Sequence, residues 1–483
     1  MHKIANFING KLVPPVSGTY FDTFEPAVGK AYASVPDSDA KDLELAVDAA
    51  KKAFPAWRDT PAEVRAQMLE KLASLMEAKK DEFIRAESVD TGKPLWLAAS
   101  VDVPRGIANL RVFADAARQF GGQQFEKADS KTYTLRQPIG VVSIISPWNL
   151  PLLLFTWKLA PAVASGNCVI AKPSEVTPIT AYMLSELINE AGFPAGVINV
   201  VHGKGAKIGA AITAHPEIPA ISFTGGTETG ITIYSGAAKM LKKVSLELGG
   251  KNPTIVFDDA DMQKTVPETL RAAFANQGQV CLCGSRLFIH KNIYEKFKEH
   301  FVAAVKMNTV GDPLAEGTKL GATVSKEHME KVLGYIDLAK QEGGKILTGG
   351  KRAKVSGRCE NGYFIEPTVI EGLPHTCRTN QEEIFGPVVT LMPFDTEEEV
   401  LMMANSTQYG LAASVWTQDK ARAARMAEKL QAGIIWLNAW NLRDLEAPFG
   451  GVKKSGVGRE GKWRAMEFFT DEKTVTMPKG DAA

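Results

Sequence analysis

The chain has 483 residues, with 56 basic against 55 acidic side chains and a formal net charge of +1. This length allows roughly two to four domains, and the balanced charge favours neither nucleic acid nor an anionic membrane as a partner. Its five cysteines are scattered, which does not resemble a disulfide framework and indicates a reducing compartment. We therefore expect a cytoplasmic enzyme of ordinary size that acts on small molecules.

Targeting segments and metal motifs are not evident. Residues 1–6 lack an apolar core before a small-residue cleavage site, so we expect no secretory signal. The most apolar stretch, residues 150–164, is interrupted by a lysine and a proline and falls short of the ~20 residues that a membrane-spanning helix needs. No His-Glu-x-x-His segment or second cysteine pair at zinc-site spacing occurs, so we expect no catalytic metal.

Helical and strand-like patterns alternate in the first half of the chain. Thr60-Pro61-Ala62-Glu63 combines an N-cap, a helix-starting proline and a capping-box glutamate, and predicts the start of a long helix. Further along, short apolar runs alternate with helical patterns, which indicates βαβ units and a parallel sheet. The expected strands are Val141 to Ile145, Cys168 to Ala171 and Val197 to Val201, and the expected helices are Leu153 to Ala164, Ile179 to Ala191 and Ala206 to Ala214.

A second series of strand-like runs predicts another α/β domain. Its expected strands are Thr254 to Phe257, Arg286 to His290, Val388 to Pro393, Ala412 to Thr417 and Gly433 to Asn438, interleaved with helices such as Lys326 to Glu342. Between the two halves stand Gly249 and Gly250, a pair that favours a boundary or hinge. We find no convincing internal repeat.

Cys281 occupies a junction between a helical and a strand-like pattern. Apolar residues at spacings of three and four from Val266 to Phe274 predict the helix, and Arg286 onward reads as the strand. Gly278 and Gly284 permit sharp bends between them. A thiol in such a connection can reach a substrate, whereas a buried structural cysteine is the alternative.

Two glycine-bearing segments follow expected strands and could bind phosphate. In Gly203 to Gly209 the last spacing is one residue too long for the usual dinucleotide fingerprint. The segment with Gly225, Gly226 and Gly230 could open a helix with its N–H groups toward a pyrophosphate, and is the better candidate.

A lysine and a carboxylate stand at the end of another expected strand. Lys172 and Glu175 could hold the hydroxyls of an adenosine ribose, although a solvated turn would look the same in sequence. Glu175 would repel a 2′-phosphate, so this site indicates NAD rather than NADP.

Six segments in one order resemble the aldehyde dehydrogenase superfamily, from about Asn6 to Pro478. They are Ser146-Pro147-Trp148-Asn149, Ala171-Lys172-Pro173-Ser174-Glu175, Phe223-Thr224-Gly225-Gly226, Leu246-Glu247-Leu248-Gly249-Gly250-Lys251, Gly278-Gln279-Val280-Cys281 and Glu383-Ile384-Phe385-Gly386-Pro387. The resemblance implies an α/β fold with a Rossmann-like NAD-binding domain (1–120 and 139–249) and an α/β catalytic domain (250–449). It also implies a small β oligomerisation extension (121–138 and 463–483).

The resemblance implies a role for each residue of the reaction. Cys281 would attack the aldehyde to give a thiohemiacetal and then a thioester, while Asn149 and the Cys281 N–H stabilise the oxyanion. Glu247 would activate water and release a free acid rather than a coenzyme A ester. Lys158 and Glu460 match positions proposed for proton relay. The positions that would bind NAD are Trp148, Lys172, Glu175, Gly225, Gly226, Gly230, Glu383 and Phe385, with Gly226 standing where the family often has serine.

Within the superfamily the chain looks most like the 2-aminomuconic and 2-hydroxymuconic semialdehyde dehydrogenases. That likeness places Arg111 and Arg443 where arginines hold the distal carboxylate of the substrate, beside Trp157 and Phe449. In the alternative, Arg443 pairs with Asp444 and Arg111 lies on a solvated helix face. A general aliphatic, aromatic or amino-aldehyde dehydrogenase, and a catalytically silent binding or structural protein on this scaffold, are the other functions considered.

Strand-like alternation after Thr470 suggests a terminal strand. In the family such a strand, with a hairpin near Gly122 to Pro138, extends the sheet of a partner, so a homodimer or homotetramer is expected. An intramolecular edge strand is the alternative. Cys283 could form a protective disulfide with Cys281, but packing is the favoured interpretation.

Overall fold

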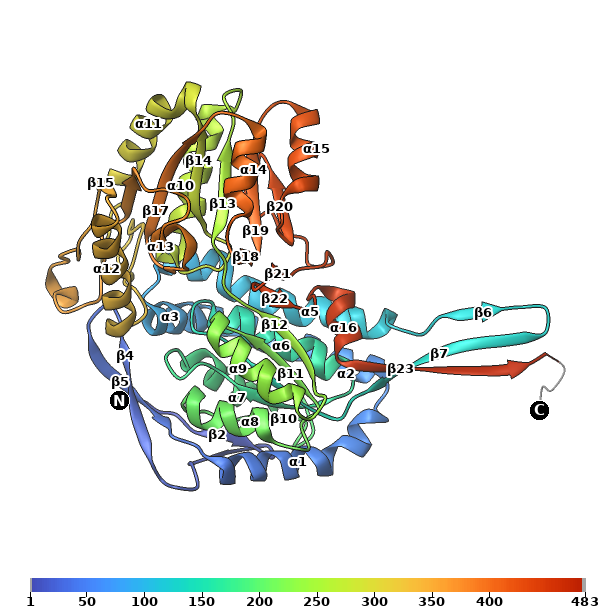
Figure 1. The fold of residues 1–483 in the computed structure, drawn as a ribbon. Helices are drawn as coiled ribbons and strands as arrows, with labels where there is room; N and C mark the ends of the chain where they lie inside the picture. Colours follow the sequence, from blue (N-terminus) through green and yellow to red (C-terminus); the bar gives the residue numbers. More distant parts are fainter. Residues whose placement is uncertain (1, 480–483) are drawn as a thin grey trace.

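The computed structural model describes residues 2–479 and consists of two α/β lobes with a long β arm at one side (Figure 1). The first lobe is built on an eight-stranded sheet in the order β22-β12-β11-β8-β9-β10-β2-β3. Its parallel centre comprises β8 (Val141–Ile145), β9 (Cys168–Lys172), β10 (Ile198–Val200), β11 (Ala220–Thr224) and β12 (Lys243–Glu247). The edge strands β2 (Asn6–Ile8), β3 (Lys11–Val13) and β22 (Gly456–Val457) are antiparallel.

The order of the parallel strands reverses between β8 and β11. From β8 the chain moves outward through β9 and β10, and it then returns to the other side of β8 to add β11 and β12. In open α/β sheets ligands bind beyond the carboxyl ends of the strands at such a switch point. The residues that follow these strands therefore face one crevice, and the Rossmann-like fold expected from the sequence is confirmed.

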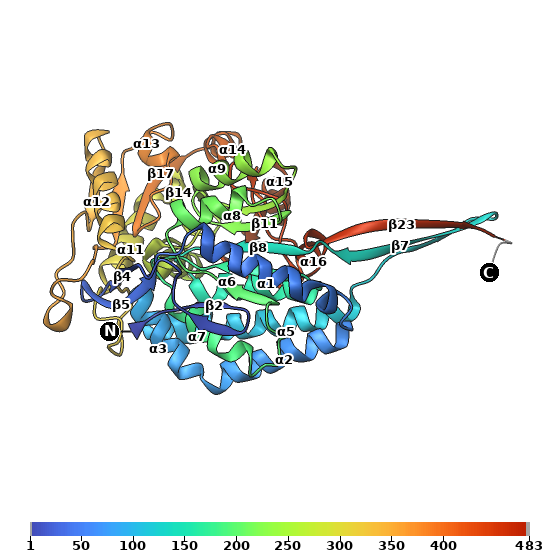
Figure 2. The ribbon, with the colours of Figure 1, turned by 90° about the horizontal axis from the view of Figure 1, so that it is seen from below.

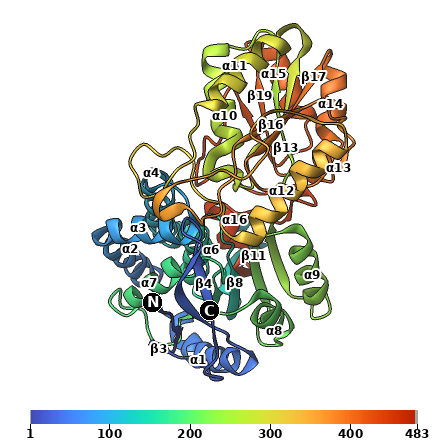
Figure 3. The ribbon, with the colours of Figure 1, turned by 90° about the vertical axis from the view of Figure 1, so that its left-hand side faces the viewer.

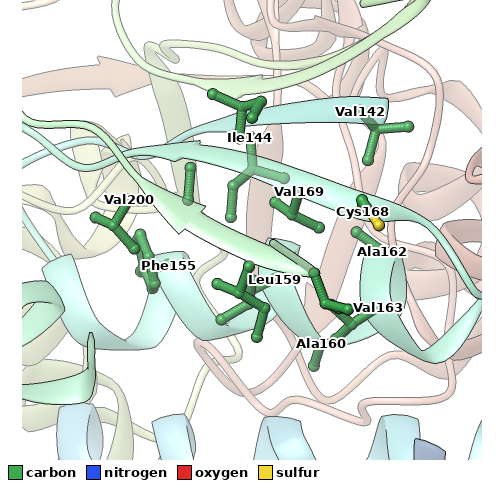
Figure 4. Packing of buried hydrophobic residues seen from close by; sticks show 14 of the residues in the cluster. Val142, Ile144, Phe155, Leu159, Ala160, Ala162, Val163, Cys168, Val169 and Val200 are labelled. Carbon is green, nitrogen blue, oxygen red and sulfur yellow. The ribbon is translucent and has the colours of Figure 1, made fainter. Parts of the chain in front are cut away.

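The first lobe is held by one large apolar core around α6 (Pro151–Ala164). Figure 4 shows Val142 and Ile144 of β8 and Val169 of β9 facing Phe155 and Leu159 of α6. The strands read as continuous apolar runs because helices cover the sheet. The helical segments here are α1 (Ala40–Arg58), α2 (Ala62–Ala78), α3 (Lys80–Thr91), α4 (Leu95–Leu97), the π-helical turn η1 (Ala98–Asp102), α5 (Val103–Gln119), α7 (Ile179–Ile188), the π-helical turn η2 (Gly205–Gly209), α8 (Ala210–Ala214), α9 (Thr227–Ala238) and α16 (Lys462–Phe468).

The second lobe lies next to the first and contains a seven-stranded sheet (Figure 3). Its order is β15 (Lys345–Thr348), β16 (Thr368–Glu371), β17 (Val388–Phe394), β14 (Gly284–His290), β13 (Asn252–Val256), β19 (Ala412–Trp416) and β20 (Ile434–Leu437). All neighbours are parallel except β15 and β16. This confirms the second α/β unit expected from the sequence.

Helices and short elements surround the second sheet and the chain ends. The helical segments are α10 (Met262–Phe274), η3 (Ala275–Gly278), η4 (Lys291–Ile293), α11 (Tyr294–Lys306), α12 (Lys326–Gln341), η5 (Gly357–Cys359), α13 (Arg378–Gln381), α14 (Glu397–Asn405) and α15 (Lys420–Lys429). Strands β18 (Tyr409–Gly410) and β21 (Val452–Lys453) pair with each other, and β1 (His2–Lys3), β5 (Lys30–Pro36) and β4 (Tyr20–Glu25) form a small separate sheet.

The arm projects well beyond both lobes (Figure 2). It contains β6 (Gln124–Glu126), β7 (Ser130–Pro138) and β23 (Thr470–Pro478), and β23 pairs antiparallel with β7 along its whole length. The expected start of the terminal arm segment at 463 is too early. Residues 463–468 belong to α16, which packs on α5 and α6 with Met466 in the core of the first lobe.

Of two local predictions, one is wrong. Thr60 does not cap α2, because its hydroxyl donates to the Ala56 carbonyl at 2.9 Å and no side chain caps the helix start. Gly249 and Gly250 lie between β12 of the first lobe and β13 of the second, at the expected boundary. A Cβ on Gly249 would clash with the Glu383 carboxylate. Glycine is therefore required there for close packing between the lobes.

In the part of the chain described here, no helix is long and apolar enough to cross a membrane. Among the same residues, no group of three or more His, Cys, Asp or Glu side chains is arranged to hold a metal ion. All five cysteines are free thiols.

Candidate active site

Cys281 lies on a connection between α10 and β14 whose backbone is tightly specified. Asn276 and Gln277 precede it with φ of 51° and 56°, a conformation that costs energy for residues other than glycine. The Asn252 amide donates to the carbonyls of Cys281 and Cys283 at 2.7 and 2.9 Å. Gly278 (φ 71°) is needed because a Cβ there would clash with the Gly386 backbone. The half-buried Cys281 is thus held by contacts within the second lobe.

The surroundings of the Cys281 thiol oppose its ionisation. Burial raises its pKa, and the carboxylates of Glu247 and Glu383 raise it further, whereas the Arg443 guanidinium lowers it. Cys283 is buried, with its sulfur 3.8 Å from the Ala275 carbonyl oxygen, and burial raises its pKa to about 12. Both thiols are free, in line with the packing interpretation of Cys283.

Asn149 follows β8 and reaches the loop that carries Cys281. Its side-chain nitrogen donates to the Gln279 carbonyl at 2.9 Å. Its own carbonyl oxygen accepts hydrogen bonds from Lys93 Nζ at 3.0 Å and Asn276 Nδ2 at 2.9 Å. A primary amide has two N–H donors, so one remains for an oxygen bound near Cys281.

Glu247 ends β12 and is 4 % exposed. Within residues 2–479 neither of its carboxyl oxygens has a hydrogen-bond partner. Burial raises its pKa well above the usual value and Glu460 adds to this, while Lys158, Arg459 and Arg443 act in the opposite direction. A buried, unpartnered carboxyl with a raised pKa is a candidate proton acceptor.

Lys158 and Glu460 form a buried ion pair next to Glu247. Lys158 Nζ lies 2.5 Å from Glu460 Oε1 and donates to Ser222 Oγ at 2.9 Å. The Trp157 indole N–H donates to the other Glu460 oxygen at 2.8 Å. The pair is therefore fully satisfied inside the protein.

The expected ribose site forms at the end of β9. Lys172 Nζ lies 3.0 Å from Glu175 Oε2, and the Gly205 N–H donates to Glu175 Oε1 at 2.8 Å. Burial alone would raise the Glu175 pKa, but Lys172 and the backbone N–H more than offset it and hold the pKa below its usual value. Glu175 is thus a carboxylate at neutral pH.

The three glycines after β11, Gly225, Gly226 and Gly230, have different surroundings. Gly226 precedes the first residue of α9, and a Cβ on it would meet open space. A Cβ on Gly230, one turn into the helix, would clash with the Leu248 side chain. Only Gly226 is open to a ligand, because a Cβ on Gly225 would clash with the Phe223 ring. Gly230 lets α9 pack against Leu248, and its contact with phosphate stays a prediction.

Glu383, Phe385 and Trp148 meet on the opposite side of the crevice. The Gly250 N–H donates to Glu383 Oε1 at 2.9 Å, and burial raises the Glu383 pKa. The rings of Trp148 and Phe385 pack edge to face with centroids 5.2 Å apart. The ring centroids of His328 and Trp148 are 4.9 Å apart, and His328 Nε2 is 2.7 Å from the Phe385 carbonyl oxygen. Burial lowers the His328 pKa to about 4, so its ring is neutral and donates this hydrogen bond.

Arg443 approaches the catalytic cluster through aromatic contacts. Its guanidinium carbon lies 3.9 Å from the centroid of Phe449 and 5.9 Å from that of Trp157. Among residues 2–479 it makes neither an ion pair nor a hydrogen bond, so the alternative pairing with Asp444 does not form. Burial lowers the Arg443 pKa, while Cys281, Glu460 and Glu247 raise it.

Arg111 does not reach this cluster. It lies on the exposed face of α5 and pairs with Glu77 of α2, each side chain being 50 % exposed. The prediction that it holds the substrate is therefore wrong, and its solvated-face alternative is correct. Arg105 of the same helix lies on the other side, with its guanidinium carbon 5.3 Å from the Trp157 centroid.

Comparison with known proteins agrees with this arrangement. The family model "Aldehyde dehydrogenase family" matches residues 13–475. The chain belongs to the aldehyde dehydrogenase family. It is 48 % identical over 478 residues to a 2-aminomuconic semialdehyde dehydrogenase of Danio rerio, covering 98 % of each chain. It is 44 % identical over 482 residues to a 2-hydroxymuconic semialdehyde dehydrogenase of Pseudomonas sp. (strain CF600), covering 98 % of this chain and 99 % of that one.

A solved structure of an aldehyde dehydrogenase from Bacillus cereus in complex with NAD+ superposes with a TM-score of 0.96. It is 40 % identical to this chain and the alignment covers 99 % of this chain and 97 % of that one. The family membership makes the protein an aldehyde-oxidising enzyme, as the sequence motifs predicted.

Several residues that shape the site of this aldehyde dehydrogenase escaped the sequence analysis. Arg105 Nε donates to Asn109 Oδ1 at 3.0 Å, and the Asn109 amide in turn donates to the Leu153 carbonyl and the Thr156 hydroxyl. The spacing of four between Arg105 and Asn109 puts them on one helix face and could have linked them. Lys93, Asn252 and His328 act through contacts between distant segments, for which the sequence carries no local signal.

Proposed function

We propose that this aldehyde dehydrogenase oxidises, with NAD as cofactor, an aldehyde that already carries a carboxylate, in the class of 2-aminomuconic and 2-hydroxymuconic semialdehyde. The observation that supports this most is the position of Arg105 and Arg443 on the ring of Trp157. Burial lowers the pKa of Arg105 to about 9, and the positive charge of Arg443 contributes to this shift. Two like charges therefore lie close together. A bound carboxylate would relieve that repulsion and accept paired hydrogen bonds.

The named relatives support the same substrate class. The proteins that bear the names 2-aminomuconic and 2-hydroxymuconic semialdehyde dehydrogenase align over almost the whole chain. Neither arginine has a carboxylate partner among residues 2–479. Arg443 lies near Cys281 and Glu247, and Arg105 lies near Arg443. Trp157 and Phe449 form the apolar surfaces between them, on which the carbon chain of the substrate would lie.

Cys281 is the proposed nucleophile of the first step. Its sulfur bonds to the carbonyl carbon as the thiol proton passes to the Glu247 carboxylate, and the carbonyl electron pair moves to the oxygen. The free N–H of Asn149 and the backbone N–H of Cys281 stabilise that oxygen, and each such donor is typically worth about 3–4 kcal/mol. Loss of hydride from the carbon then leaves a thioester on Cys281.

Glu247 is the proposed base of the second step. Its carboxylate accepts a proton from water as the water oxygen bonds to the thioester carbon, and the carbon–sulfur bond then breaks to give a carboxylic acid and the Cys281 thiolate. Its lack of any hydrogen-bond partner in the described residues leaves both oxygens available to water. Lys158 and Glu460 set its electrostatic surroundings, and we assign them to proton transfer away from Glu247.

The crevice at the strand switch point fits NAD. The open space at Gly226 and the N–H groups that start α9 suit a pyrophosphate, and Lys172 with Glu175 suits the adenosine ribose. Glu383 accepts the Gly250 N–H and suits the second ribose. When bound, NAD accepts the hydride. We assign this binding to residues 1–120 and 139–249, and the nucleophile to 250–449.

The arm supports a proposed homodimer or homotetramer. Strand β23 pairs with β7, so the arm is a complete three-stranded sheet within one chain, yet it has little of the protein beneath it (Figure 2). Such a sheet is marginal in water unless another surface covers it. We propose that residues 121–138 and 470–479 pair with a second copy of the chain.

The function is tested by NADH absorbance with a semialdehyde acid and a neutral aldehyde of equal length. The proposal predicts a kcat/KM for the acid higher by about tenfold or more, because a charged hydrogen bond contributes roughly 1.5–3 kcal/mol. Equal values would favour a general aldehyde dehydrogenase. Folded protein that forms no NADH with either compound would favour a catalytically silent binding protein.

A further inference from the structure

A buried cluster of charges lies outside the residues assigned so far. Lys93, Glu87 and Asp102 have side chains with 0 % exposure. Lys93 Nζ is 2.7 Å from Asp102 Oδ1 and 3.7 Å from Glu87 Oε1. Burying such charges costs several kcal/mol each, so a buried ion pair is weak evidence for a role in stability. Another contact of Lys93 indicates what the cluster does.

Lys93 reaches the backbone of Asn149. Its ammonium donates to the Asn149 carbonyl oxygen at 3.0 Å, across 56 residues of sequence. The same oxygen accepts the Asn276 amide at 2.9 Å. Asn149 is therefore fixed from one side by the first lobe and from the other by the loop that leads to Cys281.

The backbone around Lys93 is shaped for this contact. Helix α3 ends at Thr91, and Gly92 adopts a left-handed conformation with φ of 78° that turns the chain inward. The Ser88 hydroxyl donates to the Lys93 carbonyl at 2.6 Å. Asp102 comes from η1, a π-helical turn, and such turns are frequent at functional sites. These features fix the backbone from which the Lys93 side chain reaches Asp102 and Asn149.

Asp102 is the nearer partner of Lys93. Burial raises the pKa of both Glu87 and Asp102, and the adjacent Lys93 lowers both. Lys93 Nζ lies closer to Asp102 than to Glu87, so Asp102 is its ion-pair partner. An ammonium has three N–H donors, and one of them is directed at the Asn149 carbonyl.

The Asn149 side chain depends on the same backbone. Its amide nitrogen already donates one N–H to the Gln279 carbonyl, two residues before Cys281. The direction of the second N–H follows from where the Asn149 backbone is held. A displacement of about 1 Å at a reacting centre can cost about a hundredfold in rate.

We propose that Lys93, held by Asp102, is a positioning residue that fixes the Asn149 backbone so that the free amide N–H points at the oxyanion. The proposal rests on the function assigned to Asn149 above. Lys93 touches neither aldehyde nor cofactor in this account. Its effect is confined to the step that forms the oxyanion.

A double-mutant cycle tests the proposal. Lys93→Met, Asn149→Ala and the combined variant are compared by the single-turnover rate of NADH formation at saturating aldehyde and NAD. Lys93→Met alone lowers this rate between about tenfold and a hundredfold, with KM for aldehyde and NAD nearly unchanged. In the Asn149→Ala background the same substitution has almost no further effect, because the amide that it would misplace is gone.

Two further variants separate positioning from stability. Lys462→Met removes an ammonium whose side chain is 4 % exposed and which pairs with Asp115 and Glu446, far along the chain from Asn149. It lowers the unfolding temperature but leaves the single-turnover rate unchanged. If Lys93→Met does not fold, Lys93→Gln replaces it, since the glutamine keeps a donor, and its smaller loss of rate also disappears with Asn149→Ala.

The outcomes distinguish this inference from the function on which it rests. Equal losses of rate from Lys93→Met with and without Asn149 would overturn the positioning role alone. An unchanged rate in Asn149→Ala by itself would overturn the oxyanion role of Asn149 and the inference with it.

Discussion

The guanidinium carbon of Arg443 lies 3.9 Å from the centroid of the Phe449 ring, and no carboxylate within residues 2–479 pairs with it. Arginine stacks on aromatic rings because its planar cation is weakly hydrated and is attracted to the ring face. Stacking leaves the N–H groups at the rim of the guanidinium free. The Arg443 guanidinium thus lies near Cys281 with N–H groups that have no carboxylate partner in the described residues.

Removing either arginine should lower selectivity for an acidic aldehyde. Arg443→Ala and Arg105→Ala should each reduce kcat/KM for the semialdehyde acid by about 10- to 100-fold, with a much smaller change for the neutral aldehyde. Steady-state NADH formation measures both. Arg111→Ala is the matched control, since it removes an arginine from the exposed face of the same helix. An equal loss for both substrates would exclude the carboxylate role.

Asn109 should act on selectivity through Arg105. Its Oδ1 accepts the Arg105 Nε–H at 3.0 Å, so Asn109→Ala frees the guanidinium to leave Trp157. We expect a loss of about tenfold in kcat/KM for the acid, the value of one hydrogen bond to a charged group. In an Arg105→Ala background the substitution should have no further effect on selectivity. Independent losses from the two substitutions would contradict this link.

The release of acid should depend on pH through Glu247. Its raised pKa means that the carboxyl gains a proton as pH falls through a value well above 4.5, and the protonated form cannot accept a proton from water. The steady-state rate should therefore fall toward low pH with that midpoint. Glu460→Gln should move the midpoint to lower pH, because the Glu460 charge raises the Glu247 pKa. A midpoint that stays in place would exclude this coupling.

The Lys158–Glu460 pair should matter for stability. Lys158→Met leaves a carboxylate buried without its partner, at a cost of about 3–5 kcal/mol in the free energy of unfolding. Adding Glu460→Gln should recover part of the loss. Lys51→Met breaks an exposed pair with Glu217 and should cost less than about 1 kcal/mol. Denaturant unfolding followed by tryptophan fluorescence measures all three, and similar losses in Lys158→Met and Lys51→Met would contradict the prediction.

The sequence predicted the strands well where apolar runs were continuous. Strand β8 matches its expected range, and α12 begins at the expected Lys326. Parallel strands covered by helices must be apolar throughout, so their pattern is local and readable. Thr60 does not cap α2 because its hydroxyl donates instead to the Ala56 carbonyl of the preceding helix.

The site was predictable in its motifs but not in its supporting contacts. Cys281, Glu247 and Asn149 stand out because the family motifs contain them. Arg111 was named because the family resemblance placed it at a substrate arginine, and only the packing of α5 on α6 shows that Arg105 is the one that meets Trp157. Lys93 reaches Asn149 across 56 residues, a distance at which a single sequence carries no pairing signal.

The most direct test of the account is to trap the covalent intermediate. In Glu247→Gln the thioester should form but hydrolyse slowly, by about 10²–10⁴-fold, because the base is missing. One NADH per subunit should appear in a burst, and mass spectrometry of the peptide with Cys281 and Cys283 should find the acyl group on Cys281. Cys281→Ser should abolish both the burst and the adduct. A burst without an adduct, or an adduct on Cys283, would contradict the account.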